Sequence, residues 1–404
     1  MNSNADKFKG PKKCKGLFIL FEGISDTVID SQVILHARTI REREIADFEI
    51  WSFACLDELY KRSVAKINEA QELSGCKVRI FRGVRPSYPF SSVRNAYIFW
   101  KKLRKYRPKF EFIHARTDYS TTVCAYLKLL RHFELIWDCR GDSEAEFLGR
   151  YNHNLPLGVL LKWYQIINFR WRTAVASRAC QKAIFVSKPL KELKARPFFK
   201  KKYAIIPSAA SEKMFYFDKK LRKKMRQRLE YDECDKVIIY CGSMASYQCF
   251  PETVHLFDLL YQKDEKYKFL IITPQKDSAM NYLQCLPDGS WKIFSAKIIE
   301  VNSYLNAADY AVMLRNHNPI NVVASPTKFA EYCLTGLPII MTNSIQDSYN
   351  LAKRLGNLCA FGFDDKDNFV LQSVEDRMSI ANTYQKILSK TSVAAAYSDI
   401  YQSC

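Results

Sequence analysis

The chain has 404 residues and a mass of 47.0 kDa, more than one hydrophobic core usually supports, so we expect two or three domains. Hydrophobic residues make up 48% and charged residues 26%, which excludes disordered, collagen-like and coiled-coil chains. The formal net charge of +20 predicts an anionic partner such as nucleic acid, an acidic membrane or a phosphorylated ligand.

The cysteines and the apolar runs indicate the cellular compartment of the protein and whether it spans a membrane. Thirteen cysteines are scattered without a C-x-x-C pair, which excludes a zinc ribbon and favours reduced thiols in the cytosol. The apolar run 17–21 ends at Glu22, so it is too short for a signal peptide and suits a buried first strand. No apolar run approaches the roughly 18 residues of a membrane span. We therefore expect a soluble or peripheral protein.

Short apolar runs alternate with amphipathic segments in two successive series. The first series lies at 17–21, 78–81, 111–114, 134–138, 183–186 and 203–206, and the second at 236–240, 268–272, 292–294, 309–314 and 338–341. Such alternation predicts the α/β class, with parallel sheets covered by helices on both faces. Two series predict two doubly wound, Rossmann-like domains facing across a cleft. Ligands should bind beyond the carboxyl ends of their strands.

Two features mark the middle of the chain. Pro207 and the polar stretch 208–213 indicate the join between the two series. The run Lys219–Arg228 holds seven Lys or Arg in ten positions, which is typical of a solvated surface. We predict an exposed helix there.

The segment 325–338 carries the clearest chemical signal. Ser325 suits a helix N-cap and Pro326 suits the first turn, which predicts a helix whose free N–H groups attract phosphate. Lys328 adds positive charge. Glu331 lies three residues later on the same face, where its carboxylate suits vicinal hydroxyls. The alternative interpretation is a capped helix with an ordinary surface Lys–Glu pair.

The tract SPTKFAEYCLTGLPII, which begins at Ser325, resembles the donor-site helix of GT-B glycosyltransferases. The similarity is greatest to the retaining glycosyltransferase family 4, within it to enzymes of bacterial surface polysaccharide synthesis. The resemblance implies that Glu331 is the final Glu of an E-x7-E motif and binds the nucleotide ribose, with Ser325 and Thr327 also in the donor site. The first Glu of the motif falls at Val323, so the motif is half present.

Further donor-site residues follow from the same resemblance. Gly242 and Ser243 end the first strand of the second series, where a small-residue turn lets the backbone approach the donor diphosphate. Many family members place an Arg and a Lys after this turn, but 244–250 contains neither. Arg315 and Lys328 are therefore the expected diphosphate-binding cations.

The first series also matches the family in order. The segment 29–33 opens the first helix, where the family has a loop facing acceptor and phosphate. Asp138 and Arg140 follow a strand that faces the cleft, and we expect them to contact sugar or acceptor. Many members use a His near the donor sugar; here either His114 or Arg116 fills that place, depending on registration.

The resemblance implies an acceptor domain at 1–206, a nucleotide-sugar donor domain at 207–380 and a helix at 381–404 that crosses back. It implies a retaining hexosyltransferase-type reaction from a nucleotide diphosphate sugar to a hydroxyl of a lipid-linked glycan, in lipopolysaccharide or capsule synthesis. We expect no cofactor and no metal. The Asp365-Lys366-Asp367 triplet is interpreted as a surface loop and not as a D-x-D metal motif.

Two stretches, 94–109 and 157–178, combine Lys and Arg with aromatic residues. Such surfaces suit an anionic bilayer, which predicts a cytoplasmic protein held peripherally at the inner face of the cell membrane. Each stretch could instead be a solvated helix whose aromatic residues pack on the sheet. Two other functions stay open. An epimerase of the same fold would leave these stretches without a role, and a nucleic-acid-binding protein would explain the charge but lacks any recognised signature. No nucleic-acid partner is expected.

Overall fold

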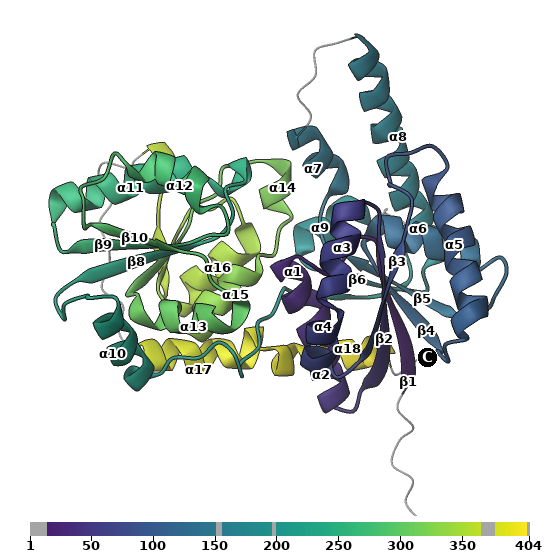
Figure 1. Ribbon diagram of the computed structural model, residues 1–404, viewed down its shortest axis with the longest axis horizontal. Helices are drawn as coiled ribbons and strands as arrows, with labels where there is room; N and C mark the ends of the chain where they lie inside the picture. The colour runs from purple at the N-terminus through teal and green to yellow at the C-terminus, as the bar shows by residue number, and fades with distance from the viewer. Residues whose placement is uncertain (1–13, 151–155, 196–198, 365–375, 402–404) are drawn as a thin grey trace, which may run out of the picture.

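Two parallel α/β domains make up the computed structural model, which describes residues 14–150, 156–195, 199–364 and 376–401 (Figure 1). The first domain has a seven-stranded sheet in the order β3-β2-β1-β4-β5-β6-β7, and the second has a six-stranded sheet in the order β10-β9-β8-β11-β12-β13. In each domain the chain first adds strands on one side of the domain's first strand and then adds the remaining strands on the other side. The predicted doubly wound, Rossmann-like architecture is confirmed.

The strands of the first domain are β1 (Cys14–Leu20), β2 (Ala46–Ala54), β3 (Lys77–Arg82), β4 (Phe112–Arg116), β5 (Glu134–Cys139), β6 (Lys182–Phe185) and β7 (Lys202–Ile205). Its helices are α1 (Thr27–Ile29), α2 (Leu35–Glu42), α3 (Asp57–Ala65), α4 (Ile67–Ser74), α5 (Ser91–Tyr106), α6 (Thr117–Leu127), α7 (Ser143–Arg150), α8 (Pro156–Ala179) and α9 (Lys188–Lys194). A π-helical turn at Asp30–Ile34 joins α1 to α2.

The strands of the second domain are β8 (Lys236–Cys241), β9 (Tyr267–Ile272), β10 (Trp291–Phe294), β11 (Tyr310–Met313), β12 (Ile339–Met341) and β13 (Leu358–Ala360). Its helices are α10 (Lys219–Arg228), α11 (Phe250–Lys263), α12 (Lys276–Leu283), α13 (Ile298–Ala307), α14 (Pro319–Val322), α15 (Thr327–Leu334) and α16 (Gln346–Leu355). Separate apolar clusters pack on the two faces of this sheet. None of the helices in the described ranges is long and apolar enough to cross a bilayer.

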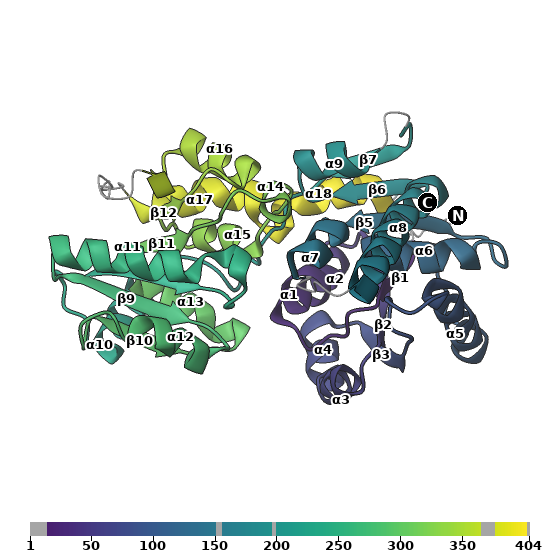
Figure 2. The ribbon, with the colours of Figure 1, turned by 90° about the horizontal axis from the view of Figure 1, so that it is seen from above.

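Two helices, not the single closing helix expected, end the described chain. Helix α17 (Arg377–Leu388) packs on α15 of the second domain, and α18 (Lys390–Tyr401) packs on α2 and β7 of the first (Figure 2). The break falls at Ser389, where the crossing chain meets the linker between the sheets. There Ala210 N donates to Leu388 O at 3.1 Å, and Lys390 N donates to Ala210 O at 2.9 Å.

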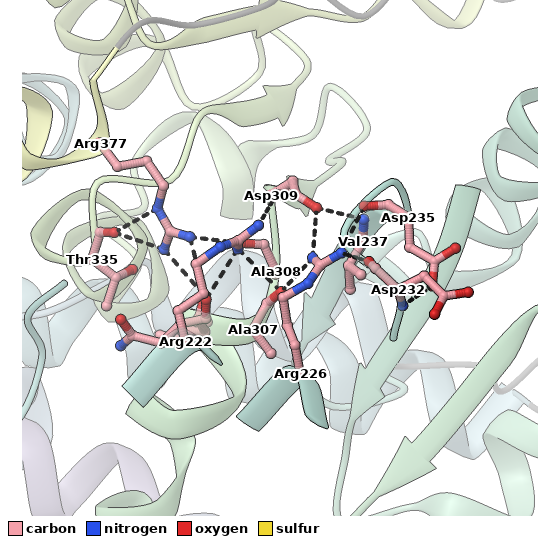
Figure 3. Close-up of polar contacts among 12 residues, drawn as sticks. Arg222, Arg226, Asp232, Asp235, Val237, Ala307, Ala308, Asp309, Thr335 and Arg377 are labelled. Atoms are coloured by element: carbon pink, nitrogen blue, oxygen red, sulfur yellow. Dashed lines mark hydrogen bonds and ion pairs between the residues drawn. The ribbon is translucent and has the colours of Figure 1, made fainter. Parts of the chain in front are cut away.

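The basic run forms a helix, α10, but it is not simply an exposed one. Arg222 and Arg226 turn inward and donate to carbonyl groups at the end of α13 and to Asp309 (Figure 3). Arg377, the first residue of α17, donates to Ala308 O at 2.7 Å in the same cluster. Three guanidinium groups therefore satisfy the unpaired carbonyls that every helix end leaves, and they fix the start of α17 on the second domain.

Gly336, which follows α15, is locked against α17. Its φ is +68°, and a Cβ atom there would lie 2.0 Å from the backbone oxygen of Arg377. Gly289 has a similar φ of +77°, but a Cβ atom there would meet nothing within 4 Å. We expect Gly289→Ala to lose about 1–2 kcal/mol of unfolding free energy from backbone strain alone. Gly336→Ala should lose about 1–3 kcal/mol more, because the overpacked backbone must move.

Urea unfolding of the two variants checks this prediction, since Gly289→Ala isolates the strain from the steric overlap. Equal losses in the two variants would show that α17 yields to the added methyl group and is not fixed against α15.

Candidate functional site

Helix α15 begins one residue later than the sequence predicts. Pro326, with φ −70° and ψ 132°, takes the N-cap position, and no side chain caps the helix. Ser325 is not the cap, because its hydroxyl oxygen accepts a hydrogen bond from Ser208 N at 2.9 Å. Ser325 thus connects the helix start to the interdomain linker, while Thr327 opens the helix. The first-turn N–H groups remain uncapped by any side chain and are suited to an anion.

Lys328 and Glu331 form an ion pair of 2.7 Å within α15. The pair is not an ordinary surface pair, because the side chain of Glu331 is only 2% exposed and that of Lys328 is 30% exposed. Burial acts to lower the pKa of Lys328, but the Cys241 thiol and the Glu331 carboxylate together raise it above its usual value. Lys328 is therefore a fixed cation at the start of α15.

Helix α15 is tied to the turn that follows β8. The hydroxyl of Tyr332 accepts from Cys241 N at 3.1 Å and donates to Cys241 O at 3.3 Å. A Cβ atom at the next residue, Gly242, would lie 2.4 Å from Gln248 Oε1, so a side chain there would displace Gln248. These contacts hold the small-residue turn beside Lys328.

Gln248 organises the rest of this turn. Its Nε2 donates to Ser243 Oγ at 2.7 Å, and its backbone oxygen accepts from Arg315 Nη1 at 3.3 Å. The structure thereby brings Ser243 and Arg315, both predicted donor-site residues, to the same glutamine. Sequence reasoning missed Gln248, because nothing near it in the chain indicates that a loop glutamine contacts both partners.

Arg315 is a buried cation, with 7% of its surface exposed. Its guanidinium donates to Leu314 O at 2.7 Å, and no carboxylate of the described residues lies within ion-pair distance. Burial lowers the pKa of Arg315, but an arginine remains protonated in proteins. Its charge is therefore not neutralised by an acid, which suits an anionic ligand.

Val323 occupies the position of the missing first Glu. It is 4% exposed and packs into an apolar cluster of the first domain with Trp137 and Phe185. Its backbone oxygen accepts from Ser187 Oγ at 2.8 Å. This position therefore makes an interdomain contact and offers no carboxylate to a ligand.

The candidate site residues that the sequence predicts in the first domain lie in two different places, the core of the domain and the end of β4. Asp138 and His114 are fully buried, with His114 Nε2 lying 3.0 Å from Asp138 Oδ2. Arg140 Nε donates to the same carboxylate at 2.8 Å. Arg116, the last residue of β4, instead contacts Glu22 and Gln32 in the segment after β1. Arg116 therefore lies at the strand end, whereas His114 lies in the core.

Helix α18 covers the buried group around Asp138. The hydroxyl of Tyr401 lies 2.8 Å from His114 Nδ1 and 3.0 Å from His36 Nε2, while Arg140 Nη2 donates to the hydroxyl of Tyr397 at 3.2 Å. Asp138 and Arg140, expected to contact sugar or acceptor, and His114, one of the two candidates near the donor sugar, are instead buried beneath α18 in this arrangement. They fasten the crossing helix to the sheet.

The charges within this group are set by their neighbours. Burial and the nearby His114 lower the pKa of His36 well below its usual value, and burial also lowers that of His114, although Asp138 opposes the shift. Burial works against ionisation of Asp138, but Arg140 and His114 hold the pKa of its carboxyl well below the usual range. The network thus consists of an ion pair and two neutral imidazoles.

No group of three or more His, Cys, Asp or Glu that could hold a metal ion occurs in the part of the chain that the structure describes. The Asp365-Lys366-Asp367 triplet lies outside the described residues.

The buried histidines predict an acid-sensitive fold. In the unfolded chain His36 and His114 titrate near about pH 6.5, whereas their lowered pKa values keep them neutral in the folded protein. Their contribution is therefore complete well above that pH and is lost as the pH falls through it, by at most about 1.4 kcal/mol per pH unit for each histidine. Urea unfolding between pH 7.5 and 5.5 measures the slope.

His36→Gln should make this slope shallower, and His255→Gln, which removes an exposed histidine of α11, should leave it unchanged. A slope that is the same in His36→Gln as in the wild type would contradict the neutral assignment.

Comparison with known proteins agrees with the fold. No protein-family model matches the sequence, and no curated protein matches it significantly. Among solved structures, HepE from Anabaena, in complex with UDP and glucose, is 13% identical, with a TM-score of 0.68 over 97% of this chain and 100% of that chain.

Two further solved structures are similar over nearly their full length. Sucrose-phosphate synthase from Thermosynechococcus elongatus is 12% identical, with a TM-score of 0.65 over 97% of this chain and 99% of its own. WaaG, a glycosyltransferase involved in lipopolysaccharide biosynthesis, is 12% identical, with a TM-score of 0.63 over 96% of this chain and 100% of its own. The likeness spans both domains and their order, and the chain has the GT-B fold of these glycosyltransferases.

Proposed function

We propose that the protein is a glycosyltransferase that uses a nucleotide diphosphate sugar as donor. The arrangement at α15 carries this proposal: an uncapped helix start, two cations and a buried carboxylate converge beside the Gly242 turn. The solved structures with the same fold include complexes with UDP, UDP-glucose and ADP, which supports a nucleotide donor here.

The chemistry of sugar transfer from such a donor requires stabilisation of the departing diphosphate. Lys328 and Arg315 would supply positive charge that is already fixed in place, so little reorganisation is needed as the negative charge develops. Glu331 would accept hydrogen bonds from the ribose hydroxyls. These charges make a resident metal ion unnecessary in this proposal, and no covalent nucleophile is assigned.

We further propose a lipid-linked glycan acceptor and retention of configuration, as in surface polysaccharide synthesis. The resemblance of the 325–340 tract to retaining family 4 enzymes supports retention. Support for a lipid-linked acceptor comes from an exposed apolar stripe on α8, which projects from the first domain (Figure 1). Its members are Leu160, Trp163, Ile167 and Trp171, each more than half exposed.

The stripe is unlike the packed helix that was the alternative interpretation. Trp163 and Trp171 are 57% and 56% exposed, so these aromatic side chains face solvent and do not pack on the sheet. Residues spaced by three and four positions share one face of a helix. Together with the basic residues of α5, this face suits an anionic bilayer, which supports our proposal that the protein is held peripherally at the inner face of the cell membrane.

The donor site is tested by Glu331→Gln, which keeps the shape of the side chain but removes its charge. Losing one charge-assisted hydrogen bond costs about 1.5–3 kcal/mol, so we expect affinity for a nucleoside diphosphate to fall roughly ten- to hundredfold. Thermal shift and calorimetry with UDP and ADP measure the change. Glu252→Gln, on the exposed side of α11 in the same domain, is the matched control.

Unchanged affinity in Glu331→Gln, with the wild-type protein binding nucleotide, would place the ribose elsewhere. Failure of the wild type to bind any nucleoside diphosphate or its sugar would overturn the proposed function.

Membrane contact is tested by Ile167→Glu on the α8 stripe. Ile299 on α13 is 64% exposed, as is Ile167, so Ile299→Glu makes the same chemical change on the second domain. We expect the wild type and Ile299→Glu to co-sediment with anionic vesicles at low salt, and Ile167→Glu to remain largely in the supernatant. Charge reversal at Lys101 and Lys102 on α5 should also weaken binding.

Equal sedimentation of the two glutamate variants would contradict the α8 assignment. Tight, salt-sensitive binding to single-stranded nucleic acid in place of vesicles would favour the nucleic-acid alternative.

A further inference from the structure

Lys390 is a buried lysine at the point where the chain crosses between the domains. Only 6% of its surface is exposed, and it is the first residue of α18. Its backbone N–H donates to Ala210 O, but its ammonium group makes no hydrogen bond or ion pair with any described residue. An ammonium group on a side chain this deeply buried is costly without a partner, and because its nitrogen is not sealed from solvent it is open to a ligand or a change of charge.

The other buried cations of the described chain all have partners. Lys182 pairs with Glu134, Lys194 with Asp118 and Asp142, Arg226 with Asp309 and Arg116 with Glu22, while Arg172 and Arg315 donate to backbone carbonyls. Lys390 alone in this group lacks both an acid and an acceptor.

Charged groups from both domains act on Lys390 without forming an ion pair with it. Arg140, after β5, belongs to the first domain; Glu331 lies on α15 of the second; and Glu212 lies on the linker. Burial, followed by the positive charge of Arg140, lowers the pKa of Lys390 to about 7, while Glu212 and Glu331 act in the opposite direction. The charge of Lys390 also acts on His36 of α2.

We propose that Lys390 is a diphosphate-binding residue of the donor site, which takes up a proton from solvent when the nucleotide binds. The inference rests on the proposed function and deepens it. Lys390 N donates to Ala210 O, and Ser208 N in the same linker donates to Ser325 Oγ at the start of α15. The linker therefore brings Lys390 close to the helix that carries Glu331, the proposed ribose ligand. Lys328 is already paired with Glu331, which leaves Arg315 and Lys390 as the buried cations with no paired acid around the diphosphate.

Proton uptake follows from linkage. An anion beside Lys390 favours the ammonium form and raises its pKa from about 7, so above neutral pH the bound complex holds more protons than the free protein. By reciprocity, nucleotide affinity should increase as the pH falls from about 8.5 toward 7. The same lysine should destabilise the free protein, because the folded state disfavours the charge that the unfolded chain carries up to about pH 10.4.

Calorimetry of UDP binding at pH 7.5, in two buffers that differ in ionisation enthalpy, tests the proposal. The wild type should take up a fraction of a proton on binding. Lys390→Met should take up less than the wild type and bind about tenfold more weakly, as expected for one lost charge-assisted contact, while being at least as stable to urea. Lys386→Met, on the exposed side of α17, should behave as the wild type.

Lys390→Arg provides a second test, because a guanidinium is always charged. It should retain affinity without the proton uptake attributed to Lys390. If Lys390→Met binds UDP with wild-type affinity and proton uptake, this inference is wrong and the proposed function stands. If the wild type binds neither UDP nor ADP, both are wrong.

Discussion

The crossing between the two domains depends on one short contact between chain segments that are far apart in sequence. The linker at Ala210 and the crossing segment at Leu388–Lys390 exchange two backbone hydrogen bonds. The domains also meet where Val323 packs against the first domain, but the exchange at Ala210 marks the point at which the chain crosses. This contact also fixes where α17 ends and α18 begins, so the two closing helices are anchored at the same point of the linker.

The two helices on either side of this contact are held by different interactions. Arg377 anchors α17 through carbonyl groups of the second domain, whereas Tyr397 and Tyr401 anchor α18 through buried polar groups of the first. A buried carboxylate such as Asp138 requires full pairing, since an unpaired charge in the core costs several kcal/mol, about 3–5 when one partner is removed. Helix α18 therefore completes the first domain and is not an appendage to it.

The sequence predicted those parts of the fold whose signal is local. The apolar run of β1 and the tract of α15 lie close to where periodicity and composition put them. Strand β2 was missed because Glu49 interrupts its apolar character; the structure shows this carboxylate accepting from Trp51 Nε1 and Arg79 Nε. Strand β13 was also missed, because it is only three residues long. The roles of Gln248 and Lys390 arise from contacts between distant segments, which one sequence does not display.

The donor-side charges show why these distant contacts matter for function. A buried cation without an acid lowers stability in the free protein, yet it is already desolvated when an anion arrives. Arg315 is held by the carbonyl groups of Gln248 and Leu314 in the second domain, and Lys390 is held at the crossing by the linker. An anion that contacts both cations would link the second domain to the crossing. Binding energy from the nucleotide could then favour one relative orientation of the domains, because only that orientation satisfies both cations at once.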